Sequence, residues 1–348
     1  MNTSWTRQLI STSAVLLACG ACSTATSGSG GPADTVEPVD AGGSAAVEPV
    51  AAPACAVDTI TTSIPAAGVD TAFGITQGPG GTWYAHGGTI NRINKDGTID
   101  EFPLPDADTA SAGWLTRDRK TSLIWFSDRS NGRIGTIDAE GSVEEYQIKD
   151  GPNGADGPAG IVVGPGTQVW FTEPMNNRIG VLDTATGDIT LQPAPTAGGG
   201  PIGLVRGPDG NLWFTEREVD KVARMNKDGS FTEWDLARGA GPNRIIAGPD
   251  ESIWFTELMT NQLGRIDSAG HLAETTLAGG PVGIATGPDG HVYVALWTTN
   301  QVARLGDDAS IARTWDLPHG ALLVAAGPDS IWATNAFDDS VSRVQLTC

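Results

Sequence analysis

The chain has 348 residues, and its 41 acidic and 21 basic residues give a formal net charge of −20 at pH 7. A surface with this charge repels nucleic acid phosphates and anionic lipids, which argues against a nucleic-acid-binding or direct lipid-binding function. The 46 glycines and 22 prolines indicate many tight turns and few long helices.

The first residues have the features of an export signal. Arg7 precedes the apolar stretch LISTSAVLLA, which is too short to span a bilayer. The next residues, Leu16 to Cys19, resemble a bacterial lipobox, in which the cysteine is lipidated. We therefore predict a lipoprotein signal peptide over residues 1–18 and lipidation of Cys19, with Cys22 as the fallback site. The alternative is a cleaved signal that releases a free protein.

The segment after the signal has a composition typical of a linker. Residues 23–54 contain no Lys, Arg or aromatic residue and are rich in Gly, Ser, Ala and Pro. Such a segment cannot bury enough apolar surface to fold. We expect residues 19–54 to be a disordered tether. The expected location is the cell envelope, at the outer membrane or in the periplasm of a bacterium with two membranes, with membrane contact only through the lipid anchor.

The remainder of the chain repeats one pattern seven times. A unit such as residues 201–236 contains the apolar stretch PIGLVRG, the turn PDG, the strand NLWFTE, the strand DKVARMN, the turn KDG and the strand SFTEWDL. A period of about 40 residues with several short strands is typical of a β-propeller. We predict an all-β, seven-bladed propeller of four-stranded blades over residues 55–348. The repeats align on Trp83, Trp125, Trp170, Trp213, Trp254, Tyr293 and Trp332.

The two ends of the repeat region are complementary. After Trp332 there is sequence for only one more strand, SVSRVQLTC, while the early segment VDTITTSIP matches the outer strand GTIDEFPLP of the first blade. We expect the N-terminal segment to close the ring by completing the last blade. Cys55 begins this donated strand and Cys348 ends its neighbour, so we predict a Cys55–Cys348 disulfide in place of a turn. The alternative is two unpaired thiols.

The residue three positions after each aligned aromatic is expected at one mouth of the central channel. Four consecutive blades place a carboxylate there, which suggests an acidic mouth that holds Mg²⁺, Ca²⁺ or a cationic ligand. The alternative is that each carboxylate caps local backbone N–H groups or pairs with a base such as Arg178 or Lys221. The full ring reads His86, Asp128, Glu173, Glu216, Glu257, Leu296 and Asn335.

The start of each inner strand faces the same mouth and follows the motif P-x-G-I. The variable position is mostly apolar, and in the last blade it is His319. An apolar rim with one histidine can bind a small amphipathic molecule. The residues expected to face this substrate are Phe73, Asn243 and Val282, and the other variable positions are Ala112, Ala159 and Ile202.

The repeats GPDGNLWFTE and IWFTELMTNQLGRI resemble the virginiamycin B lyase (streptogramin B lyase) family over about residues 57–346. The resemblance implies a seven-bladed propeller. It also implies a Mg²⁺-dependent lyase that opens a cyclic depsipeptide antibiotic by elimination at its ester.

By this resemblance, His319 matches the general base, but most other catalytic positions are not matched. Val282 stands at the position of a companion histidine, Leu317 at that of a metal-supporting glutamate, and Phe73 at that of a substrate-binding tyrosine. Asn335 or Ala336 stands at the position of a second metal-supporting glutamate. We therefore expect weak or absent streptogramin lyase activity.

Two functions remain open from the sequence. The first is a propeller that binds a small molecule or a cell-surface protein, and nothing in the sequence indicates that it forms an oligomer. The second is a carbon–oxygen lyase of the same family type, dependent on a divalent metal and acting on a lactone or ester. A calcium-dependent lactonase propeller is a weaker third option, because such propellers have six blades and the repeats here number seven.

Overall fold

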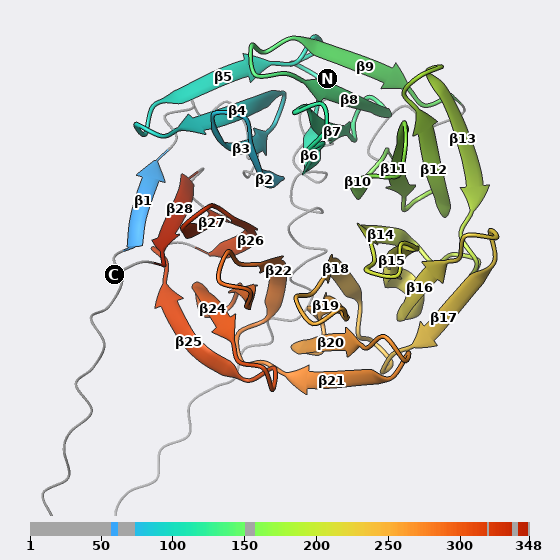
Figure 1. Ribbon diagram of the computed structural model, residues 1–348, viewed down its shortest axis with the longest axis vertical. Helices are drawn as coiled ribbons and strands as arrows, with labels where there is room; N and C mark the ends of the chain where they lie inside the picture. The colour runs from blue at the N-terminus through green and yellow to red at the C-terminus, as the bar shows by residue number, and fades with distance from the viewer. Residues whose placement is uncertain (1–56, 62–73, 150–156, 319, 336–339, 347–348) are drawn as a thin grey trace, which may run out of the picture. The chain divides into compact units, whose positions relative to one another are not determined.

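The computed structural model describes residues 57–61, 74–149, 157–318, 320–335 and 340–346 (Figure 1). All strands belong to one compact unit, Ala56–Thr347. Within the described residues, the single helix is the short 3-10 turn η1 (Arg217–Val219), and no helix has the length and apolar character that a membrane crossing needs.

The first four blades are antiparallel sheets of strands consecutive in sequence, so each blade is a meander. Blade one contains β2 (Ile75–Gly78), β3 (Gly81–His86), β4 (Thr89–Asn94) and β5 (Ile99–Pro103), and blade two contains β6 (Ala112–Arg117), β7 (Ile124–Asp128), β8 (Arg133–Ile137) and β9 (Val143–Gln147). Blade three contains β10 (Ile161–Val163), β11 (Gln168–Glu173), β12 (Arg178–Asp183) and β13 (Asp188–Pro193), and blade four contains β14 (Pro201–Arg206), β15 (Leu212–Glu216), β16 (Lys221–Met225) and β17 (Phe231–Asp235).

Blades five and six follow the same order, and blade seven differs in the origin of its outer strand. Blade five contains β18 (Pro242–Ala247), β19 (Ile253–Glu257), β20 (Gln262–Ile266) and β21 (Leu272–Thr276), and blade six contains β22 (Pro281–Thr286), β23 (Val292–Leu296), β24 (Gln301–Leu305) and β25 (Ile311–Asp316). Blade seven contains β26 (Ala321–Ala326), β27 (Ser330–Asn335), β28 (Ser340–Gln345) and β1 (Val57–Thr61).

The ring is closed by the N-terminal strand. β1 pairs antiparallel with β28, with Val57 opposite Val344 and Thr61 opposite Ser340. The innermost strands contact one another in sequence, and β26 of the last blade also contacts β2 of the first (Figure 1). The predicted seven-bladed propeller of four-stranded blades is confirmed, and the sheet order agrees with the predicted strand donation. The described residues contain no cysteine, so the Cys55–Cys348 disulfide stays a prediction.

The repeated Trp joins the two hairpins of a blade. Trp213 is 4 % exposed, and the guanidinium of Arg224, on the next strand, lies 5.3 Å from its ring centroid. The Nε1–H of the same indole donates to Asp209 in the preceding Pro-Asp-Gly turn at 3.1 Å. Trp254 makes the equivalent contact with Asp250 at 3.0 Å. The pattern PD-x-x-x-W therefore encodes a turn that is held by its own strand.

The repeated Phe explains small residues on the third strand. The rings of Phe171 and Phe255 are fully buried and lie over Gly180 and Gly264. A Cβ at either glycine would come closer than 3.0 Å to the ring, a contact that real Cβ atoms essentially never show. The third-strand glycine is therefore required by packing of the aromatic ring.

The repeated Thr connects blades three, four and five to the blade that follows each of them. Its hydroxyl accepts a hydrogen bond from the inner strand of its own blade and donates one to the inner strand of the following blade. In blade five, Thr256 Oγ1 accepts from the N–H of Arg244 at 3.2 Å and donates to the carbonyl of Val282 at 2.9 Å. The corresponding donations from Thr172 and Thr215 reach the carbonyls of Ile202 and Asn243, each at 2.9 Å. These buried hydroxyls fix the spacing between inner strands.

Replacing Thr256 with Val tests this inter-blade contact. The substitution keeps the side-chain shape but leaves a buried carbonyl and a buried N–H without a partner, so we expect a loss of about 1–3 kcal/mol in the free energy of unfolding. Denaturant-induced unfolding followed by circular dichroism measures this loss. Thr276→Val, at an exposed position on β21, is the matched control and should change little. Equal stability of the two variants would show that the Thr256 hydroxyl does not stabilise the contact between blades.

Candidate functional site

The four predicted carboxylates end the second strands of blades two to five and are completely or almost completely buried. Their relative exposures are 0 % for Asp128, Glu216 and Glu257 and 1 % for Glu173. They are therefore parts of the protein interior, and their partners decide what they do.

Asp128 and Glu173 each bond to nearby residues, either in their own blade or in the segment that enters it. Asp128 Oδ1 accepts from the N–H of Ser111 at 2.9 Å, in the segment that enters the blade, and its Oδ2 accepts from the Asn131 side chain at 2.8 Å. Glu173 forms a 2.9 Å ion pair with Arg178. Both arrangements correspond to local capping and pairing, the alternative that the sequence left open.

Glu216 faces a second carboxylate. Its Oε1 accepts from the N–H of Thr196 at 3.4 Å, in the segment that enters blade four, while its buried Oε2 has no hydrogen-bond donor. Burial raises the pKa of Glu216 to about 8, and a hydrogen bond with Glu233 on β17 adds to the rise. A protonated Oε2 can donate to Glu233, so near neutral pH this pair shares one proton.

Glu257 of blade five also lies near a second carboxylate, but the residue opposite it is not a cation. Thr260 Oγ1 donates to Glu257 Oε2 at 3.2 Å, and the buried Oε1 has no donor. Burial raises the pKa of Glu257 to about 7, and the charge of Glu274 on β21 contributes. Gln262 stands opposite Glu257, where Lys221 and Arg178 stand opposite the acids of blades four and three.

The structure thus places the four acids in four separate local networks. Within the described residues, no group of three or more His, Cys, Asp or Glu side chains could hold a metal ion. An acidic arc that binds one divalent cation through side chains of several blades is not what these contacts form.

The positions that the family resemblance assigns to metal-supporting glutamates do not fit a metal either. Leu317 is 5 % exposed and has no ligand atom in its side chain. Asn335 is fully buried, and its Nδ2 donates to Ser340 Oγ at 2.6 Å and to Ser342 Oγ at 2.8 Å. The side chain of Asn335 is therefore engaged within blade seven. His319, the predicted general base, Phe73, and Ala336, the alternative to Asn335, lie outside the described residues.

The two other substrate-facing predictions fall on inner strands. Val282 is 3 % exposed and Asn243 is partly exposed. The backbone carbonyl of each accepts a hydrogen bond from the Thr hydroxyl of the preceding blade. The backbone at both positions is thus fixed by the neighbouring blade. Val282 presents an apolar side chain where the resemblance expects a histidine.

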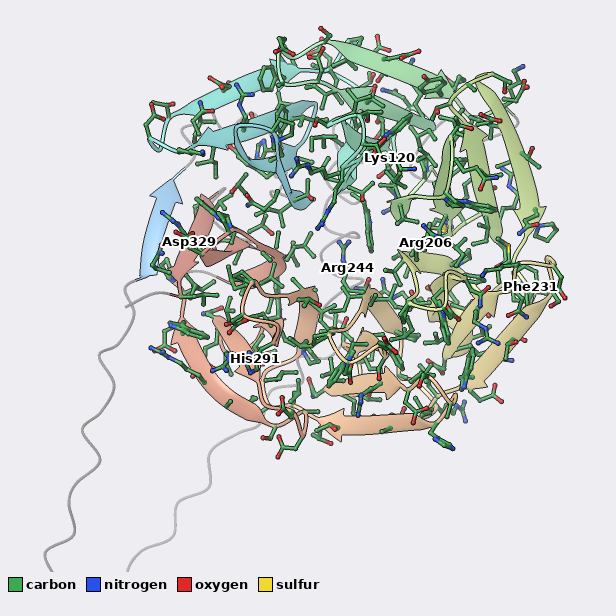
Figure 2. All side chains as sticks on the ribbon, in the orientation of Figure 1. Lys120, Arg206, Phe231, Arg244, His291 and Asp329 are labelled. Atoms are coloured by element: carbon green, nitrogen blue, oxygen red, sulfur yellow. The ribbon has the colours of Figure 1, made fainter. Side chains whose placement is uncertain are left out.

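One pair of residues that the sequence interpretation missed lies one position further along the inner strands. Leu115 pairs with Phe126 and Ile245 with Phe255, so the preceding residues, Trp114 and Arg244, occupy equivalent positions. The guanidinium carbon of Arg244 lies 3.2 Å from the centroid of the Trp114 ring, and Figure 2 shows Arg244 near the centre of the ring of blades. The signal in the sequence was PNR in blade five where blades four and six have PIG and PVG.

The raised pKa of Glu216 predicts a specific pH dependence of stability. The folded protein holds this proton more tightly than the unfolded chain, so the free energy of unfolding should fall as pH rises from about 4.5 to about 8. Glu216→Gln keeps the amide in place of the protonated acid and removes this fall. Relative to the wild type, the variant should gain roughly 1–3 kcal/mol between pH 5.5 and pH 9.

Denaturant unfolding of both proteins at several pH values measures this gain. Glu101→Gln, at an exposed position on β5, is the control and should show no such trend. A difference between Glu216→Gln and the wild type that does not change with pH would show that Glu216 does not carry the proton.

Comparisons with known proteins agree with this architecture. The model of the Virginiamycin B lyase family matches residues 124–348. No curated protein matches the chain. A solved streptogramin B lyase is 28 % identical, with a TM-score of 0.75 over 83 % of this chain and 96 % of that chain.

Two further solved structures come from Staphylococcus aureus. A virginiamycin B lyase is 28 % identical, with a TM-score of 0.75 over 84 % of this chain and 99 % of that one. A catalytically inactive variant of the lyase with quinupristin is 26 % identical, with the same TM-score and coverage. Because the family model covers more than half of the sequence, the chain belongs to the Virginiamycin B lyase family.

Proposed function

We propose that this protein is a binding propeller of the virginiamycin B lyase fold, exported and tethered at the cell surface, with weak or no streptogramin lyase activity. The observation that carries the proposal is the pair Leu317 and Asn335. Hard divalent cations such as Mg²⁺ are held by carboxylate, carbonyl and water oxygens. Leu317 offers none, and the Asn335 amide is already bound to two serines in the interior. No step of the family's reaction can therefore be assigned to these residues.

The face at the ends of the second strands suits a ligand or partner with apolar groups. Met175 and Met259 lie in the segments that follow β11 and β19 and are 66 % and 47 % exposed. Met side chains are flexible and polarizable, and they adapt to irregular apolar surfaces. A small amphipathic molecule or an apolar patch on a surface protein fits these side chains.

The second candidate is a divalent-metal-dependent lyase that opens an ester or lactone. It is supported by family membership and by 28 % identity over nearly the full length of a streptogramin B lyase. It would need a metal-binding set different from the positions discussed above, with His319 as the base.

An activity assay separates the two candidates. With quinupristin and Mg²⁺, we expect kcat/KM to be at least about 10³-fold below that of the Staphylococcus aureus lyase, because metal and acid–base assistance each contribute large rate factors. Ring opening is followed by mass spectrometry, with the lyase as the positive control. Ring opening within tenfold of the lyase, lost with chelator and in His319→Ala, would contradict the proposal and establish the second candidate.

The proposed location has its own test. Expressed in a bacterium, the full chain should fractionate with membranes and carry a lipid on Cys19, because the LLAC motif places this residue at the processing site. Cys19→Ala should abolish the lipid-dependent membrane association, whereas Cys22→Ala should leave it intact. The reverse pattern would move the lipid to Cys22, and a wild-type protein free of membranes would contradict the tether.

A further inference from the structure

The innermost strands carry a repeated glycine at one level of the central channel. A Cβ at any of these glycines would come closer than 3.0 Å to a backbone carbonyl of the next blade, so close packing of the inner strands explains them. They are Gly74, Gly160, Gly203 and Gly283. The equivalent residues in the other three blades are Trp114, Arg244 and Leu323. Two blades thus replace a packing glycine with a large polar-tipped side chain.

The inner strand of blade five has an irregular register next to Arg244. Between Pro242 and Ile245, two residues face one on β19, which is a β-bulge. Bulges bend a strand and change the direction of a side chain. Blades four and six have the same bulge with glycine at this position, so what differs in blade five is the side chain of Arg244, which Figure 2 shows near the centre of the ring of blades.

The charge of Arg244 has no counter-ion in the described part of the protein. Its Nε is buried without a hydrogen-bond partner, and no described carboxylate forms an ion pair with it. Its contact is the face of Trp114. Burial lowers the pKa of Arg244 to about 9, so the group is still protonated at neutral pH. Arg244 is only partly exposed, so water in the channel solvates its charge incompletely, and an anion bound there would compensate it.

Arg244 and Trp114 line a cavity of about 130 Å³ that is otherwise apolar. For comparison, an apolar cavity of about 150 Å³ admits benzene. A ligand of about six non-hydrogen atoms is therefore the upper limit. The remaining lining residues are Gly74, Ile75, Leu115, Ile245, Gly283, Ile284, Leu323 and Val324.

We propose that this channel cavity binds a short aliphatic monocarboxylate, with the carboxylate on Arg244 and the alkyl chain against the surrounding Ile, Leu and Val side chains. Trp114 covers one face of the guanidinium and leaves its N–H edge free to donate in the plane. A planar carboxylate accepts two parallel N–H groups from such an edge. The apolar walls supply the remaining binding energy through burial of methylene groups.

The charge of the whole protein narrows the ligand class further. A net charge of −20 disfavours the entry of multivalent anions such as phosphate more than that of a singly charged one. A carboxylate with two to four carbons has one charge, fits the volume and uses the apolar walls. This site is independent of the function proposed for the mouth, because it uses a deeper level of the channel.

Titration calorimetry with acetate, propionate and butyrate tests the proposal. We expect saturable binding that strengthens with chain length, and at least tenfold weaker binding of butyramide, which has the shape of butyrate without its charge. Arg244→Gly installs the residue of four other blades, so its fold should be retained, and it should weaken butyrate binding at least tenfold. Arg244→Lys keeps the charge but not the planar fork and should bind butyrate less tightly than the wild type.

Arg206→Gln, at an exposed position on β14, is the matched control for non-specific anion binding and should bind butyrate like the wild type. Circular dichroism confirms that each variant is folded. Binding unchanged in Arg244→Gly, or equal competition by chloride and phosphate, would overturn the carboxylate assignment. Absence of binding by all three carboxylates would overturn the site itself and would show that the Arg244–Trp114 pair only fills the channel.

Discussion

The inter-blade hydroxyl contact is the interaction on which the rest of this propeller depends. A ring of seven sheets has no central core of its own, so each inner strand must be held by its neighbours. The Thr of the repeated WFTE motif does this by accepting from its own inner strand and donating to the next, at 2.9 Å for both bonds of Thr215 and at 3.2 and 2.9 Å for those of Thr256. Apolar clusters then form between neighbouring blades, and one of them joins Trp254 of blade five to Val294 of blade six. The N-terminal strand β1 completes the last sheet, and the inner strand β26 of that sheet contacts β2 of the first blade, which closes the ring.

The buried carboxylates follow from the same geometry. A second strand that ends beside the segment entering its blade leaves backbone N–H groups there, and an acid at that position can accept from them, as Asp128 and Glu216 do. The cost is desolvation, which raises the pKa of Glu216 and Glu257. Where a cation is opposite, as Arg178 is for Glu173, an ion pair offsets part of this cost. At Glu216 and Glu257 a second carboxylate, Glu233 or Glu274, adds to the rise in pKa. Repetition of Glu in this chain is therefore explained by blade architecture before any ligand is invoked.

The sequence predicted the fold well because the fold repeats. Seven aligned aromatics, the Asp-Gly turns and the matching outer-strand segments each report the same local structure several times, so single errors do not change the result. The site is harder to predict, for the opposite reason. Whether Glu173 and Glu257 share a ligand or serve separate blades depends on where their side chains point, which spacing alone does not reveal. Arg244 was overlooked because the comparison of inner strands stopped at the variable position before it, although PNR in place of PIG was visible in the sequence.

A repeat protein marks its functional positions by departures from its own pattern. A residue that recurs in several blades is explained by a contact that recurs with it, as the Thr hydroxyl of blades three, four and five shows. Arg244 and Trp114 depart from a glycine whose packing role is plain in four other blades, and both departures meet at one point in the channel. Leu317 and Asn335 depart instead from the family to which the chain belongs, by placing a buried apolar group and an engaged amide where metal-supporting acids are expected. Both departures are compatible with the two proposals made above, a propeller that binds without the family's metal chemistry and a carboxylate site at the centre of the ring.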